Sequence, residues 1–166
     1  MFKKIFLLLS SLALTLSLCS CVFSENGESI TAFSNRMNSY NENYNMSSDG
    51  YIFDKTKSSF TRFFKFSEEE VMLRFVTDKK NRATELHIVF NTGATEENTD
   101  ISVFVENSLK SFCQDEKTYN SLCDKIDLKN ILSKPTAQTL SAEYGNIVLK
   151  ADITEIGTVI SIYKNI

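Results

Sequence analysis

Polar and apolar residues alternate with a period of two in three consecutive stretches, "KSSFTRFFKFS", "EVMLRFVTD" and "ATELHIVFNTG". Aromatic and β-branched residues at this period are typical of strands with one buried side. The polar segment "DKKNR" between the second and third stretches is typical of a hairpin turn. We therefore predict an antiparallel meander over residues 57–93. The positions that share one face are Phe60, Arg62, Phe64 and Phe66, then Val71, Leu73 and Phe75, then Thr84, Leu86, Ile88 and Phe90.

Helical spacing of apolar residues precedes and follows this meander. Before it, apolar residues follow one another at steps of three and four, which places them on one face of a helix that Ser29 can cap. After it, a run capped by Thr99 or Asp100 leads into a second one, and the helical stretches are expected to end at Pro135. The apolar positions are Ile30, Phe33, Met37, Tyr40 and Tyr44 in the first run, Ile101, Phe104, Val105, Leu109 and Phe112 in the second, and Tyr119, Leu122, Cys123 and Ile126 in the third.

The C-terminal stretch "TLSAEYGNIVLKADITEIGTVISIYKNI" returns to the strand pattern, with turns at Gly145-Asn146 and Gly157. The predicted order of elements is therefore α-β-β-β-α-α-β-β-β. Helices grouped between two runs of strands favour the α+β class, here an antiparallel β-sheet with helices packed on one face. We expect residues 29–166 to form a single domain, because their number is common for one.

The first 21 residues, "MFKKIFLLLSSLALTLSLCSC", follow a different pattern. Lys3 and Lys4 precede an uncharged, Leu-rich segment of about 14 residues, which is a usual length for a signal peptide but short of the ~20 residues of a membrane-spanning helix. The segment ends in Leu18-Cys19-Ser20-Cys21. This ending resembles the lipobox of bacterial lipoproteins, which has an aliphatic residue three positions before an obligatory Cys and a small residue directly before it.

The resemblance implies that one cysteine thiol takes up a diacylglycerol and that cleavage makes this cysteine the N-terminus. Cys21 fits best, because Leu18 and Ser20 occupy the aliphatic and the small position. Cys19 is less favoured, because the bulky Leu18 directly precedes it. We therefore expect a signal peptide at residues 1–20 and a lipidated tether at 21–28. An uncleaved N-terminal anchor is the alternative, and a metal site at the two cysteines would lack further ligands nearby.

Charge limits the partners of the mature domain. Removing residues 1–20 lowers the total of Lys and Arg from 18 to 16 against 21 Asp and Glu, so the formal net charge changes from −3 to about −5. A mildly acidic domain is a poor match for nucleic acid, because the phosphate backbone binds best to a basic surface. No run of basic residues in the chain suggests binding to anionic lipid. We expect the lipid to hold the protein on a membrane of the cell envelope, facing away from the cytoplasm.

Candidate chemistry is sparse. His87 is the single histidine, and its strand pattern points it away from the apolar positions, toward solvent. The chain contains no G-x-S-x-G elbow, no phosphate-binding glycine loop and no recognisable set of zinc ligands. We therefore predict no catalytic residue, no metal and no cofactor. The expected function is that of a non-catalytic domain that binds an envelope protein or a small ligand. The alternative is a tethered hydrolase that uses His87 with a Ser or Cys nucleophile.

Cys113 and Cys123 are candidates for a disulfide, because exported domains meet an oxidising environment. One straight helix over these residues would hold their Cα atoms about 15 Å apart, whereas a disulfide needs about 4.4–6.8 Å. The bond therefore requires a turn between them, which the polar segment "QDEKTY" could form. The other interpretation is that both cysteines are buried thiols, because Cys packs well as a small apolar side chain.

Overall fold

The computed structural model describes residues 28–165, and the lipobox, the signal peptide and most of the tether lie outside them. Over these residues the strands form one antiparallel sheet in the order β2-β3-β4-β5-β8-β7-β6, and β1 pairs with the start of β5. The strands are β1 (Glu28–Ser29), β2 (Ile52–Asp54), β3 (Ser59–Phe66), β4 (Glu69–Thr77), β5 (Arg82–Asn91), β6 (Gln138–Tyr144), β7 (Ile147–Ile153) and β8 (Gly157–Lys164).

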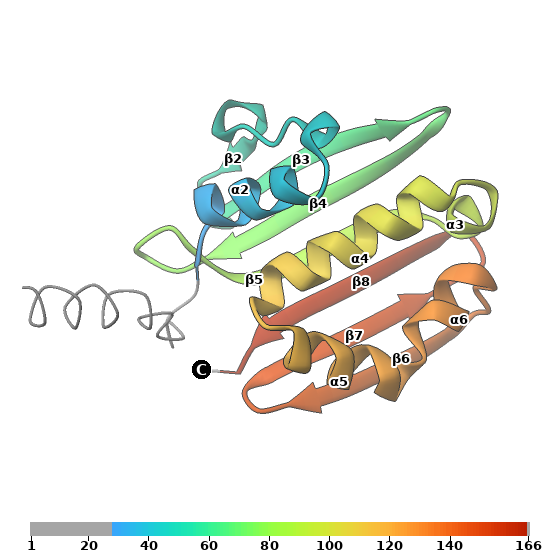
Figure 1. Cartoon of the computed structure of the whole chain (residues 1–166). Helices are drawn as coiled ribbons and strands as arrows, with labels where there is room; N and C mark the ends of the chain where they lie inside the picture. Colours follow the sequence, from blue (N-terminus) through green and yellow to red (C-terminus); the bar gives the residue numbers. More distant parts are fainter. Residues whose placement is uncertain (1–27, 166) are drawn as a thin grey trace, which may run out of the picture.

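The helices cover one face of this sheet, as Figure 1 shows. The predicted α+β class and the predicted arrangement, a sheet with helices on one face, are therefore confirmed. Among residues 28–165 no helix is long and apolar enough to cross a membrane. The helices are α2 (Ile30–Tyr40), α3 (Ala94–Glu97), α4 (Thr99–Cys113), α5 (Glu116–Ile126) and α6 (Leu128–Ser133), and two 3-10 turns, η1 (Glu42–Tyr44) and η2 (Ser48–Gly50), follow α2.

Polar caps set the helix boundaries. The side chain of Ser29 accepts a hydrogen bond from the backbone N–H of Ala32 at 3.1 Å, which confirms it as the cap of α2. The prediction of Thr99 or Asp100 as the cap of α4 is wrong. The preceding residue, Asn98, has an extended backbone, and its side chain accepts from the N–H of Asp100 at 3.0 Å. An amide oxygen at that position satisfies a free N–H of the first turn as well as a hydroxyl or a carboxylate would.

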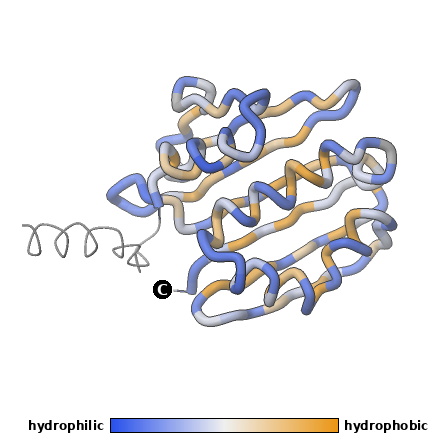
Figure 2. Tube along the Cα trace, in the orientation of Figure 1, coloured by the Kyte–Doolittle hydropathy of each residue, from blue (hydrophilic) through white to orange (hydrophobic). Residues whose placement is uncertain are grey.

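The core lies between the helices and the sheet. Leu73, Phe75, Leu86 and Ile88 are fully buried there, as the alternation predicted. Figure 2 shows hydrophobic positions along the strands and helices and hydrophilic turns between them. The inward position at the start of β5 is an exception, because the β4–β5 register shifts there. Ala83 is buried, whereas the half-buried Thr84 donates its hydroxyl hydrogen bond to the carbonyl of Val76.

The other side of the sheet carries no helix in the described part of the chain, and we call it the open face. The turns of the sheet gather at its two ends. The β2–β3, β4–β5 and β6–β7 turns lie at the end where the described chain begins and where β8 finishes. The β3–β4 and β7–β8 turns and the start of α4 lie at the opposite end. This arrangement places β8, the last strand in sequence, between β5 and β7 near the middle of the sheet.

Candidate functional site

A row of polar side chains crosses the open face. Arg74 of β4 lies opposite His87 of β5, His87 lies opposite Ser161 of β8, and Ser161 lies opposite Lys150 of β7. Residues directly opposite one another in an antiparallel sheet project from the same face, with strands about 4.8 Å apart. The strand pairing therefore assembles one continuous site from segments that are far apart in sequence.

His87 is the centre of this row. Its Nδ1 lies 2.8 Å from the hydroxyl oxygen of Ser161, and its Nε2 lies 3.1 Å from a carboxylate oxygen of Glu85. The side chain of His87 is 26% exposed, so it faces away from the core as predicted. Glu85 orients the ring, because it projects from the same side of β5 two residues earlier.

The hydrogen-bond chemistry fixes the roles in the neutral state. An ionised carboxylate only accepts, so Nε2 must carry the proton that bonds to Glu85. Nδ1 of neutral His87 is then the acceptor for the hydroxyl of Ser161. A hydroxyl, an imidazole and a carboxylate in this sequence form the linkage by which a histidine can activate a serine.

Charged groups border the same depression, whose lining includes Lys150, Asp152 and Tyr163. Nζ of Lys150 lies 2.7 Å from the carboxylate of Asp152, which also accepts from the hydroxyl of Thr139 at 2.9 Å. The hydrogen bond from Lys150 and the one from Thr139 hold the pKa of Asp152 below its usual range. The site therefore presents both signs of charge and several donors and acceptors to solvent.

The surroundings of Ser161 differ from those of a serine nucleophile. Acyl transfer needs donors aimed at the oxyanion that forms next to the attacked carbon, most often free backbone N–H groups. Ser161 lies inside β8, which pairs with β5 on one side and with β7 on the other. These ladders occupy the backbone amides around Ser161, so the described structure offers no backbone oxyanion hole there.

An apolar row runs beside the polar one. Phe63 lies opposite Met72, Met72 opposite Val89, and Val89 opposite Val159. Phe63 is 48% exposed, and the other three side chains are half-buried. A second depression on the open face is lined by the first three residues of this row together with Glu70 and Asn91. The open face thus combines apolar contact area with adjacent hydrogen-bonding groups.

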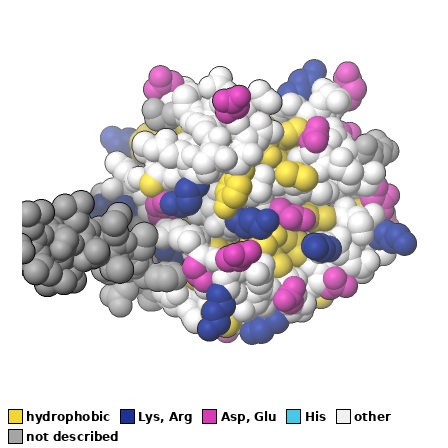
Figure 3. Space-filling model, in the orientation of Figure 1, with side chains coloured by type: hydrophobic (Ala, Val, Ile, Leu, Met, Phe, Trp, Pro, Cys, Tyr) yellow, Lys and Arg dark blue, Asp and Glu magenta, His cyan; other side chains and the backbone are white. Residues whose placement is uncertain are grey.

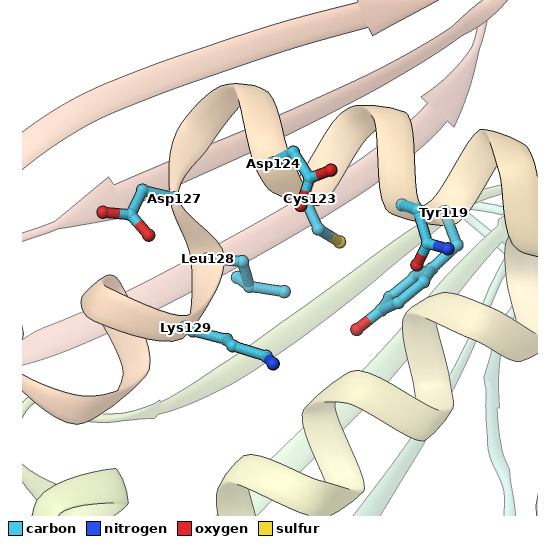
Figure 4. Close-up of a pocket in the computed structure, with 7 residues that line it drawn as sticks. Tyr119, Cys123, Asp124, Asp127, Leu128 and Lys129 are labelled. Atoms are coloured by element: carbon cyan, nitrogen blue, oxygen red, sulfur yellow. The ribbon is translucent and has the colours of Figure 1, made fainter.

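A separate cavity of about 260 Å³ lies at α5 and α6, on the helix side of the sheet. Figure 4 shows the sulfur of Cys123, the hydroxyl of Tyr119 and the ammonium group of Lys129 turned toward this hollow. Burial raises the pKa of Cys123 to about 12 and raises the pKa of Tyr119 well above its usual range. Both groups are therefore protonated at neutral pH, and Cys123 lacks the thiolate character of a nucleophile.

The chain turns back between Cys113 and Cys123, as the proposed disulfide requires. α4 ends at Cys113, Gln114 adopts a left-handed conformation (φ 65°), and Asp115 caps α5. In the structure both cysteines are buried, unbonded thiols. Burial, together with the neighbouring Cys123, also raises the pKa of Cys113 above its usual range. The disulfide stays a prediction for exported protein.

We expect the reduced cysteines to react slowly in the folded protein. At pH 8 a buried thiol with a raised pKa has little thiolate, so alkylation of Cys113 and Cys123 should be at least about a hundredfold slower before unfolding than after it. Mass spectrometry after timed alkylation measures both rates. Equal rates in the folded and unfolded protein would contradict the burial of these cysteines.

Thiol counting on unfolded, non-reduced mature protein tests the disulfide. Two unreacted positions at Cys113 and Cys123 that become reactive after reduction would support the bond, which would contribute about 2–4 kcal/mol to stability. Two free thiols in freshly exported protein would contradict it.

The structure brings together residues that the sequence did not. Glu85 carried a visible signal, because its spacing of two from His87 places both side chains on one side of a strand. Ser161 carried none, because only the β5–β8 register brings it beside His87.

Among residues 28–165 no group of three or more His, Cys, Asp and Glu side chains could hold a metal ion. No protein-family model, no curated protein and no solved structure significantly matches the chain.

Proposed function

We propose that the chain is a bacterial lipoprotein, held on a membrane of the cell envelope through Cys21, whose domain binds an envelope protein through the open face. The lipobox-type ending of the first 21 residues supports the anchor. The half-exposed apolar row on the open face supports the binding role. Exposed apolar patches bordered by polar residues are typical of protein interaction sites.

Phe63 is the observation that carries the binding role. Its ring is 48% exposed in the middle of a strand, while the opposite face of the same sheet holds the whole core. An aromatic ring that folding does not bury is typical of an interface, where aromatic residues are enriched. The depressions on this face are shallow and open to solvent, which suits a protein surface better than a small ligand, because small ligands are usually enclosed.

Site-specific photo-crosslinking in the source bacterium tests this role. We expect a photoreactive residue at Phe63 to give a discrete adduct, and the same residue at Ile156 to give none. Ile156 is a matched control, because it is apolar and 84% exposed but lies in the β7–β8 turn. A charge placed inside the apolar row by Val89→Glu should abolish the adduct at Phe63. Identical adducts from both positions, or none from either, would contradict the proposal.

The linkage of Ser161, His87 and Glu85 favours a second candidate, a membrane-tethered hydrolase with Ser161 as the nucleophile. In that role His87 would take the proton from Ser161, and Glu85 would orient the ring. We rank this candidate below binding, because the described strands leave no free backbone N–H beside Ser161 to stabilise an oxyanion.

A serine-directed fluorophosphonate separates the two functions. We expect it to leave Ser161 unlabelled, because no oxyanion donor stabilises the charge that develops when the hydroxyl attacks the phosphorus. We also expect His87→Ala to lower the free energy of unfolding by only about 1 kcal/mol, the usual worth of its side-chain hydrogen bonds. Mass spectrometry and urea unfolding give the two readouts. Labelling of Ser161 that disappears in His87→Ala would establish the hydrolase instead.

A further inference from the structure

Two turns at one end of the sheet are rich in lysine, whereas carboxylates predominate at the opposite end, which we call the acidic end. The β2–β3 turn contributes Lys55 and Lys57, and the β4–β5 turn contributes Lys79 and Lys80, all exposed; we call this the basic end. On the helix side, by contrast, Lys, Arg, Asp and Glu side chains are intermingled (Figure 3). The exposed or half-exposed carboxylates at the opposite end of the sheet are those of Glu68, Glu69, Glu70, Glu96, Asp100 and Glu155.

Two carboxylates, those of Asp54 and Asp78, lie in or next to these turns. Asp54 accepts from the backbone N–H groups of Thr56 and Lys57 and lies 3.9 Å from Nζ of Lys57. Asp78 accepts from the backbone N–H groups of Lys80 and Arg82, and the guanidinium of Arg82 lies 2.7 Å from it. The hydrogen bonds from Arg82 hold the pKa of Asp78 below its usual range. Asp78 thus serves the turn and Arg82. Over the described residues, the ammonium groups of Lys55, Lys79 and Lys80 have no ion-pair partner.

The described chain begins beside these lysines. Glu28 pairs with Ala83, directly after the β4–β5 turn, and the carboxylate of Glu28 is bound by Arg36. Figure 1 shows this starting point and the β4–β5 turn at the same end of the sheet. Six residues lie between Cys21 and Glu28, and the seven steps from one to the other span at most about 25 Å. A lipid on Cys21 would therefore bring the basic end, rather than the acidic end, toward the bilayer.

We propose that the basic end binds the anionic headgroups of the membrane that holds the lipid anchor, and so orients the domain with its acidic end away from the bilayer. This inference rests on the proposed lipid anchor. Each Lys near an anionic surface increases the equilibrium constant for membrane contact by about fivefold, and salt weakens the effect. The strands would then run away from the membrane, with the open face accessible from the side.

The test uses lipid-bearing protein purified from bacterial membranes and reconstituted into vesicles of phosphatidylcholine, alone or mixed with phosphatidylglycerol. A fluorophore on Thr56→Cys in the β2–β3 turn reports contact with the bilayer through quenching by a spin-labelled lipid. The same fluorophore on Ile156→Cys, in the β7–β8 turn, is the control. Cys113 and Cys123 are buried and compete little for the dye.

We expect phosphatidylglycerol to increase quenching at residue 56 but not at residue 156, and added salt to reverse the increase. The double variant Lys79→Gln, Lys80→Gln should reduce the ratio of quenched to unquenched protein by about fivefold for each lysine. The double variant Lys65→Gln, Lys134→Gln removes the same charge from exposed positions outside the basic end and should leave quenching unchanged.

Quenching that is equal at residues 56 and 156, or that ignores phosphatidylglycerol and salt, would overturn the proposal while leaving the anchor intact. Protein that does not float with either vesicle would instead contradict the anchor. In that case co-sedimentation of the unanchored chain with phosphatidylglycerol vesicles still tests whether the basic end binds anionic headgroups, because charge attraction needs no lipid on Cys21. If Lys79→Gln, Lys80→Gln loses co-sedimentation, the binding role of the basic end is supported. If this double variant still co-sediments, that role is overturned.

Discussion

Phe104→Ala is expected to lower the free energy of unfolding by about 3–5 kcal/mol, a large share of the stability of an ordinary domain. Phe104 of α4 is fully buried, and its ring centroid lies 5.0 Å from that of Tyr44, 4.8 Å from that of Phe64 and 5.2 Å from that of Phe66. Truncation removes the ring that joins the helix layer to β3 and leaves a cavity among rigid neighbours. Urea unfolding followed by circular dichroism measures the loss.

Val103→Ala is the matched control for this prediction. Val103 precedes Phe104 in the same helix but is 50% exposed, so its truncation should change stability by no more than about 0.5 kcal/mol. A loss below about 1 kcal/mol in Phe104→Ala, or equal losses in the two variants, would show that α4 does not pack on the sheet as described.

Cys21→Ala is expected to remove the lipid completely. Cys21 lies outside the described residues, and the expectation rests on the lipobox-type sequence around it. A hydroxyl or methyl side chain cannot replace a thiolate as the nucleophile that takes up the lipid. Metabolic labelling with a fatty acid should therefore mark the wild-type protein and leave Cys21→Ala unmarked and uncleaved by the lipoprotein route.

Cys19→Ala is the control, and it should keep its label because Leu18 and Ser20 still precede Cys21 in the favourable positions. Label retained by Cys21→Ala and lost from Cys19→Ala would show that the other cysteine carries the lipid. If neither the wild-type protein nor the variants take up the fatty acid, the lipoprotein proposal is contradicted altogether.

Periodicity predicted most of the fold, because burial of one side of each element leaves a direct mark on the sequence. The alternation of Val71, Leu73 and Phe75 located β4, and the steps from Ile30 to Met37 located α2. β1 and β2 were missed, since pairs and triplets of residues are too short to show a period. The first helix was predicted to reach Tyr44 but ends at Tyr40, because the side chain of Asn41 accepts from the N–H of Asn43 and starts a 3-10 turn.

The candidate site was harder to predict than the fold, because it depends on register between distant strands. His87 and Ser161 are separated by 74 positions, and a shift of one residue between β5 and β8 would place Ser161 on the opposite face. The same reason hid the basic end. Lys55 and Lys80 lie in different turns, and only the pairing of β3 with β4 brings those turns to one end of the sheet.

The central place of the last strand has a consequence for how the domain is completed. A chain that emerges N-terminus first, from a ribosome or through an export channel, presents β5 long before β8 is available to cover its edge. During that interval the edge carries unpaired backbone groups beside residues that are buried in the folded domain, such as Ile88 and Phe90. Such an edge can pair with other chains. Closing β5 against β8 also joins segments about 70 residues apart, which slows folding. Loss of the final strand, from Gly157 onward, would leave two half-sheets with open edges instead of a shortened domain.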